Sequence, residues 1–200
     1  MNYPDFFDSI ENISVQDPLS KTLGSIENGA YDFSYLEIVK SAGHSCPTVA
    51  GAYLSSLVGL KALFPDSPAI RGWVKVAFNQ PLEEGVTGVI SNVISHITGA
   101  TDKSGFKGLQ GKFARHSLMD FEADTNASVC FTRVDTGKMV DVSYDPSSVK
   151  PSPELMPLMA KMMQGTATEA ELKSFGELWQ DRVKRIFENI DTVVSVVNVA

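Results

Sequence analysis

Hydrophobic residues recur every three or four positions in several stretches, and this spacing predicts helices. One helix is expected over 47–64, because Pro47 suits a first helical position and prolines follow the end. Another is expected from Glu84 to a stop at Gly99. Its apolar face consists of Val86, Val89, Ile90, Val93, Ile94 and Ile97. Shorter helices are expected at 3–10 and 35–40, the second ending at Gly43.

Two more helices are expected near the C-terminus, after a linker at 146–153. The first spans about 154–164 and is rich in methionine. The second begins at Thr168, with Glu171 three residues later as in a capping box. The sequence assigns no element to the Val-rich tail 193–200.

Alternating residues rich in Val and aromatics predict a strand at 71–78, and two or three strands are expected among 118–122, 127–134 and 139–144. Residues 135–138 form a compact turn between the last two of these. Strands beside helices predict an α+β fold, with a mixed, partly antiparallel sheet packed against helices. Residues 1–150 are expected to form one metal-binding domain. Residues 151–200 are expected to be a helical extension that packs on it or on a dimer partner.

Composition narrows the class of protein. The chain has 200 residues, 43% of them hydrophobic, so it can bury a core without a disulfide or a structural metal. Its 24 acidic and 17 basic residues give a net charge of −7, which argues against nucleic-acid binding. Two cysteines fit a reducing cytosol. Neither a signal peptide nor an apolar run long enough for a membrane is visible, so a cytoplasmic location is expected.

The candidate chemistry centres on Gly43-His44-Ser45-Cys46-Pro47. Pro47 at the first helical turn places Cys46 at the N-cap, where free N–H groups and the helix dipole favour a thiolate. His44 stands two residues earlier, so both side chains can point at one spot. Imidazole and thiolate suit zinc, or another divalent transition metal. The alternative is a small buried cysteine with an incidental histidine.

A zinc site needs further ligands, and few are available. His96 is the first choice for a third ligand. It shares a helix face with Asn92, and a hydrogen-bonded structural histidine is the alternative. His116, Cys130 and carboxylates such as Asp102 are the other candidates. Cys130 lies in mid-strand and fits a buried small hydrophobic residue equally well.

A second candidate site is the glycine-rich loop around Gly108. Lys107, Lys112 and Arg115 could neutralise a small anion there, while glycines let backbone N–H groups approach it. The spacing fits neither a P-loop nor a dinucleotide-binding motif. A flexible, solvated loop is the alternative.

The motif at 43–47, with the residues 48–53 that follow, resembles the FmdE-like family, which takes its name from a component of formylmethanofuran dehydrogenase. The resemblance continues at 85–90, 97–100, 105–108 and 178–183. It implies a homodimer with a metal, usually zinc, held at His44 and Cys46, and an accessory role in one-carbon or molybdopterin-linked metabolism. Ala100 stands where members close to the naming protein have cysteine. The cysteine-rich zinc ribbon of many members is absent from this sequence.

The leading hypothesis is therefore a metal-binding protein, either an enzyme with open coordination positions or an accessory protein. A non-catalytic dimeric accessory or metal-delivery module is the first alternative. A protein that binds an anion or a pterin-like ligand through the Gly/Lys loop is the second. A Cys46 nucleophile with His44 as its base is a further variant, in which the two-residue separation makes their hydrogen bond awkward.

Overall fold

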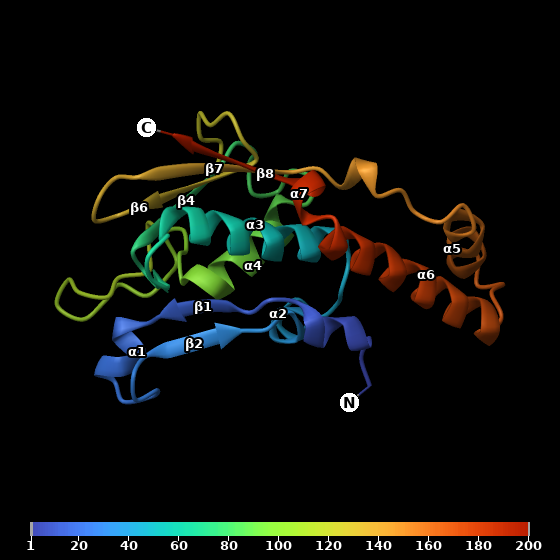
Figure 1. The fold of residues 1–200 in the computed structure, drawn as a ribbon, viewed down its shortest axis with the longest axis horizontal. Coiled ribbons are helices and arrows are strands. Elements are labelled where there is room, and N and C mark those ends of the chain that lie inside the picture. The colour runs from blue at the N-terminus through green and yellow to red at the C-terminus, as the bar shows by residue number, and fades with distance from the viewer. Residues whose placement is uncertain (1, 200) are drawn as a thin grey trace.

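The computed structural model describes residues 2–199 and has the α+β architecture that the sequence predicts. Three layers are visible in Figure 1, with a five-stranded sheet and a three-stranded sheet on opposite sides of two central helices. These helices are α3 (Pro47–Leu63) and α4 (Thr87–Thr98), close to their predicted bounds. Gly99 ends α4 in a left-handed conformation, as predicted.

The larger sheet has the strand order β5-β4-β6-β7-β8 and is mixed, since β4 and β5 are parallel and the other pairs antiparallel. Its strands are β4 (Val74–Phe78), β5 (Met119–Asp120), β6 (Val129–Arg133), β7 (Met139–Tyr144) and β8 (Val194–Val199). The predicted turn joins β6 to β7, with Gly137 at a positive φ of 73°. The tail that the sequence left unassigned forms the edge strand β8 along β7; Ala200 lies outside the described residues.

The smaller sheet, with the order β2-β1-β3, is missing from the sequence-based prediction. Its strands are β1 (Ile13–Gln16), β2 (Ala30–Phe33) and β3 (Ala69–Ile70). Each has four residues or fewer, too short for alternation to be visible. Asp17 caps the short helix α1 (Pro18–Thr22), which the sequence analysis does not predict, by accepting from the N–H groups of Leu19 and Ser20. Before β1, residues Asp5–Ser9 form the 3-10 helix η1 in place of the expected α-helical piece.

Helix α3 is buried on nearly every side, because the larger sheet packs on one side of it and α4 and other helices pack on the others. Two glycines on α3 allow the larger sheet to come close. A Cβ on Gly51 would lie 2.2 Å from the ring of Tyr144, and one on Gly59 would lie 2.8 Å from Phe131. The core of the molecule is therefore centred on α3.

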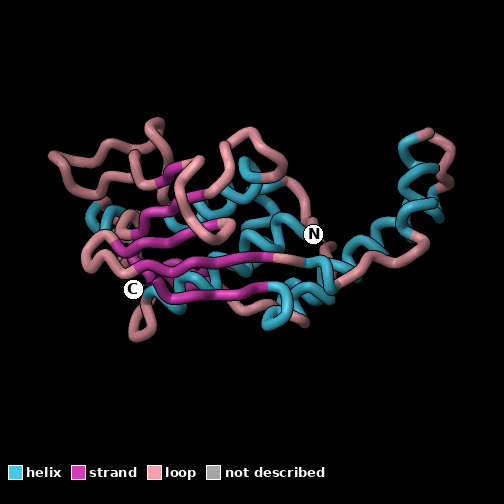
Figure 2. Tube along the Cα trace, turned by 90° about the horizontal axis from the view of Figure 1, so that it is seen from above, coloured by secondary structure: helices cyan, strands magenta, loops and turns pink. Residues whose placement is uncertain are grey.

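The C-terminal segment comprises η2 (Pro146–Ser148), α5 (Leu155–Met163), α6 (Glu169–Glu188), α7 (Ile190–Val193) and β8. The capping box at the start of α6 is present, as predicted from Thr168 and Glu171. Val183 and Ile186, in the second half of α6, are fully buried in the shared core. The first half of α6 and α5 project from the body as a helical arm (Figures 1 and 2).

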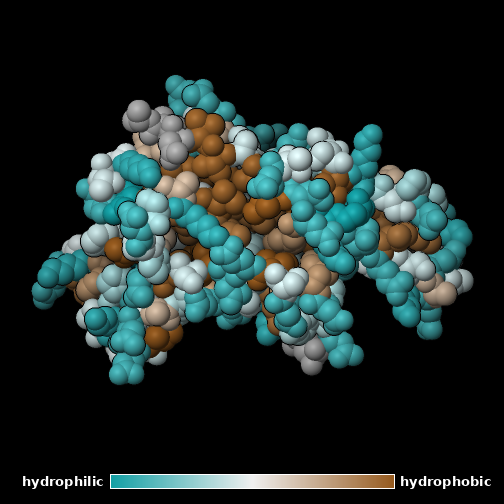
Figure 3. Space-filling view, in the orientation of Figure 1, coloured by the Kyte–Doolittle hydropathy of each residue, from teal (hydrophilic) through white to brown (hydrophobic). Residues whose placement is uncertain are grey.

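Hydrophobic side chains on the face shown in Figure 3 gather over the middle of the molecule and again on the α5–α6 arm. Hydrophilic residues surround both areas. Within residues 2–199, no helix combines the length and the apolar character needed for a transmembrane span.

Candidate functional site

The candidate site lies in the turn between α2 (Tyr35–Ala42) and α3. Gly43 ends α2 in the left-handed region, with φ of 80°, and this reverses the chain direction. Cys46 then has an extended backbone and is the N-cap of α3, as the sequence predicts. Its sulfur accepts the Val49 N–H at 3.4 Å, so it occupies the position where an N-cap side chain normally binds the helix start.

His44 and Cys46 meet across this turn. His44 Nε2 lies 3.3 Å from Cys46 Sγ, although the two residues are only two positions apart. The expectation that this spacing makes their contact awkward is wrong, because the extended Cys46 backbone turns its sulfur back toward the ring. His44 is exposed and Cys46 is 8% exposed, so the pair lies at the surface with its sulfur shielded.

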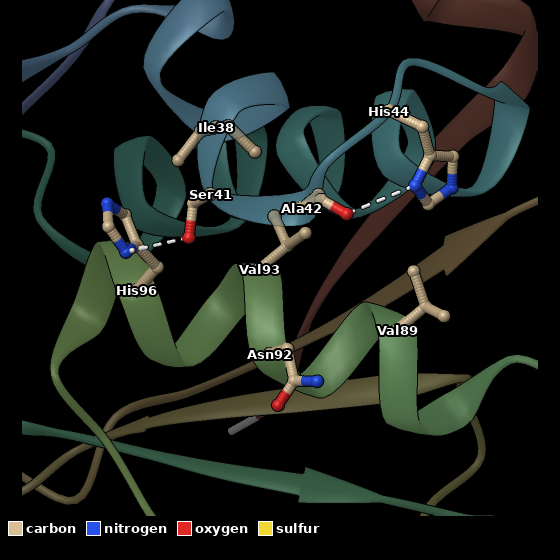
Figure 4. A pocket seen from close by; sticks show the side chains of 8 residues that line it. All are labelled: Ile38, Ser41, Ala42, His44, Val89, Asn92, Val93 and His96. Carbon is tan, nitrogen blue, oxygen red and sulfur yellow. Dashed lines mark hydrogen bonds between the residues drawn. The ribbon is translucent and has the colours of Figure 1, made fainter.

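The orientation of the imidazole is set by the end of α2. His44 Nδ1 lies 3.1 Å from the Ala42 carbonyl oxygen (Figure 4). A carbonyl oxygen can only accept, so Nδ1 carries the proton and donates it. In the neutral ring the lone pair is then on Nε2, and it faces the Cys46 sulfur. Nε2 is thus the atom available as a base or as a metal ligand.

Helix α6 holds the turn in place through Ser45. The Ser45 hydroxyl donates to Gln180 Oε1 at 2.9 Å, and the Tyr35 hydroxyl lies 3.0 Å from the Ser45 hydroxyl. The Ser45 carbonyl accepts from Trp179 Nε1 at 3.0 Å and from Gln180 Nε2 at 3.2 Å. Sequence reasoning missed these contacts. Its one signal was that the family resemblance extends to residues 178–183.

Tyr144 on β7 supports the turn from the opposite side. Its hydroxyl donates to the Pro47 carbonyl oxygen at 2.8 Å, and its ring packs against Gly51. Burial raises the pKa of Tyr144, so the phenol stays protonated and remains a donor. The backbone on both sides of Cys46 is therefore fixed by side chains from two elements, α6 and β7.

His96 lies away from the pair. It and His44 stand at opposite ends of a cavity of about 150 Å³ between α2 and α4, with Ala42 and Val93 between them (Figure 4). His96 Nδ1 contacts the Ser41 hydroxyl at 3.3 Å, and Asn92 lines the same cavity, as their shared helix face predicts. Burial, and then the charge of Arg71, lower the pKa of His96, which favours the neutral ring.

The other ligand candidates are also separate from the pair. His116 contacts Ser117, with Nδ1 3.0 Å from the hydroxyl oxygen. Cys130 is buried in β6, where burial and a hydrogen bond to Asp141 raise the pKa of its thiol to about 11. Within residues 2–199, no three or more His, Cys, Asp or Glu side chains are grouped closely enough to hold a metal ion. The donors that the structure brings together are His44 and Cys46.

The glycine-rich loop contains a tight reversal at 109–112. Leu109 and Lys112 exchange both backbone hydrogen bonds, at 2.8 and 3.0 Å. The residues between them, Gln110 and Gly111, have φ of 48° and 80°, as a type I′ turn requires. The loop is therefore organised by its own backbone. Lys107 and Lys112 are exposed, and their role as anion ligands stays a prediction.

Arg115 differs from the anion-binding prediction. It is only 7% exposed, and its Nη2 donates to Asp17 Oδ1 at 2.6 Å. Arg71 donates to Asp17 Oδ2 at 3.2 Å, so one carboxylate serves two guanidinium groups. The Arg115 side chain packs against Gly72 and Gly99. A Cβ on Gly72 would lie only 2.4 Å from Arg115 Nη1, so there is no room for a side chain at this position. Arg115 is thus engaged in a buried ion pair that ties the end of β1 to the loop.

Comparison of the chain with protein-family models gives no match, and comparison with curated proteins gives none either.

Proposed function

We propose that this protein binds a divalent transition metal, zinc in the first place, through His44 Nε2 and Cys46 Sγ. The observation that carries the proposal is the 3.3 Å separation of these two atoms. Zinc bonds of about 2.3 Å to sulfur and 2.0–2.1 Å to nitrogen place two ligands of a tetrahedral site roughly 3.5 Å apart. The observed geometry is therefore close to what a shared ion requires.

Two features around the pair support the same role. Metal-binding histidines commonly donate their second ring N–H to a carbonyl, as His44 does to Ala42. The Cys46 sulfur is also held in place, since it accepts the Val49 N–H at the start of α3, and hydrogen-bonded ligand atoms are typical of metal sites. The residues present thus fit half of a tetrahedral site.

Two protein ligands leave other positions to water, a substrate or a second protein. A metal bound with open positions lowers the pKa of coordinated water, and this is the chemistry it would supply here. The small cavity between α2 and α4 lies on the Nδ1 side of His44 and is lined in part by Ser41 and Asn92 (Figure 4). We also propose that the chain is related to the FmdE-like family, that it forms a homodimer and that it is located in the cytoplasm.

The proposal is tested by cobalt substitution of the metal-free protein. We expect about one cobalt ion per chain and a thiolate-to-cobalt charge-transfer band. Cys46→Ser should abolish the band, His44→Ala should weaken binding at least about tenfold, and Cys130→Ala should change neither. No stoichiometric uptake, or a band that survives Cys46→Ser, contradicts the proposal.

The same contact favours a second candidate, in which Cys46 is a nucleophile and His44 its base. Thiol and imidazole lie within hydrogen-bond reach, and a third group, the Ala42 carbonyl, orients the base. Iodoacetamide alkylation of the metal-free protein distinguishes the candidates. If Cys46 is a nucleophile, its alkylation near neutral pH should be faster than that of a small-molecule thiol. The rate of alkylation should fall in His44→Ala. Slow alkylation in both proteins contradicts this role.

A further inference from the structure

A second cavity, of about 360 Å³, lies beside the same turn that carries Cys46. Pro47 and Thr48, which directly follow Cys46, form part of its wall. The first turns of α3 and α4 border it on the helical side. The end of β4, the start of β6 and the Tyr144 ring border it on the side of the sheet. The turn therefore has the His44 cavity on one flank and this larger cavity on another.

None of the residues lining this larger cavity is an Asp, Glu, Lys, Arg or His. Its polar groups are hydroxyls and amides, among them those of Thr48, Ser55, Gln80 and Ser128. Apolar walls come from residues such as Phe78, Val86 and Ile90. An ion placed here would lose water without gaining an opposite charge, which is costly. A neutral molecule with an apolar body avoids that loss.

The polar groups include both donors and acceptors. The Tyr144 proton is given to the Pro47 carbonyl, so its oxygen can accept. Thr87 donates to Gln80 Oε1 at 3.2 Å, which leaves the Gln80 amide nitrogen as a donor. Ser55 is only 4% exposed, and its hydroxyl has no hydrogen bond to a side chain of residues 2–197 or to the backbone of residues 2–199. Its neighbour Ser56 does, to the Ala52 carbonyl at 2.8 Å.

We propose that this cavity binds a neutral, hydrogen-bonding ring compound, a role that goes beyond metal binding by the His44–Cys46 pair. A cavity of about 150 Å³ holds one benzene molecule, so this one has room for roughly two fused rings. Ser55 contributes a hydrogen bond to the compound from the side of α3. The open rim near Val86, which is 50% exposed, is the entry.

The test uses metal-free protein and calorimetric titration with quinazolin-4-one, a neutral fused ring with an amide. The comparison ligand is 2-naphthoate, an anion of similar size. We expect saturable binding of quinazolin-4-one with a dissociation constant of roughly 1 mM or below, the range for a ligand of this size. Binding of 2-naphthoate should be at least about tenfold weaker, given the charge-free lining.

Two matched pairs of variants locate the site. Ser55→Ala should raise the dissociation constant of quinazolin-4-one about fivefold, as for one lost hydrogen bond, and Ser56→Ala should leave it unchanged. Val86→Trp should block the rim and abolish binding. Val134 is as exposed as Val86, at 50%, but lies outside the cavity. The Val134→Trp variant should therefore bind quinazolin-4-one as tightly as the wild type does.

The proposal is overturned if quinazolin-4-one does not saturate the protein or if 2-naphthoate binds more tightly. The second outcome would show that the starts of α3 and α4 select an anion. Binding that is equal in the wild type, Ser55→Ala and Val86→Trp would also overturn it, since the compound would then sit elsewhere. Cobalt binding is measured separately, so failure of the metal site and failure of this cavity are distinguishable.

Discussion

Replacing Gly51 by Ala tests how closely the site depends on the contact between α3 and the sheet. The added Cβ would lie 2.2, 2.4 and 2.6 Å from three ring carbons of Tyr144. Carbon atoms in favourable contact are about 3.5–4.0 Å apart, so the ring or the helix must move by about 1 Å. Movement of the ring also breaks the hydrogen bond from Tyr144 to Pro47.

The expected magnitude follows from three contributions. Overpacking a core position costs about 1–3 kcal/mol, and the lost hydrogen bond adds about 1 kcal/mol. Alanine favours the helix over glycine by about 1 kcal/mol, which offsets part of the loss. The free energy of unfolding should therefore fall by about 2 kcal/mol. For a chain of this size, that lowers the melting temperature by roughly 4–8 °C.

Urea denaturation and calorimetry measure the effect, with two controls. Gly176→Ala on α6, where nothing lies within 4 Å of an added Cβ, should be stabilising by roughly 0.5–1 kcal/mol. Tyr144→Leu should relieve the collision, so that Gly51→Ala becomes neutral or stabilising in that background. The reasoning is refuted if Gly51→Ala is as stable as the wild type, or if its cost is the same with Leu at 144.

Two further predictions concern ionisable side chains. Asp17→Asn leaves Arg71 and Arg115 without their shared counter-charge and should lower the free energy of unfolding by about 3–5 kcal/mol in urea denaturation. Asp135→Asn, in an exposed pair with Arg133, should cost much less, and equal losses in the two variants would contradict the argument. The lowered pKa of His96 means that the unfolded chain binds its proton more readily. The contribution of His96 to the free energy of unfolding should be fully present above about pH 6.5. It should fall as the pH drops through the lower pKa that His96 has in the folded protein. His96→Gln should flatten that part of the stability–pH curve, and an unchanged curve would contradict the assignment.

Local signals in the sequence were sufficient for much of the fold. Helices α3, α4 and α6 were predicted because each is long enough for periodicity, capping residues and terminal glycines or prolines to agree. The hairpin of β6 and β7 was predicted from its turn. Strands β1, β2 and β3 were missed because their stability comes from partners distant in sequence, not from their own pattern.

The candidate site shows the same division. Cys46 at the helix N-cap could be inferred from Pro47 alone, since that preference is local. The contact of His44 with Cys46 depended on backbone angles at Gly43 and Cys46 that the residue types permit but do not fix. Arg115 was assigned to an anion site from its neighbours in sequence, and the folded chain instead pairs it with Asp17.

The sequence by itself determined the fold class, the central helices and the presence of imidazole and thiol beside a helix start. It did so because hydrophobic spacing, capping and turn chemistry act over a few residues. Only the tertiary structure decided the three layers, the edge strand β8, the distance of His96 from the pair and the cavity beside Thr48. Each of these joins segments separated by tens of residues, and packing rather than local preference selects among such contacts.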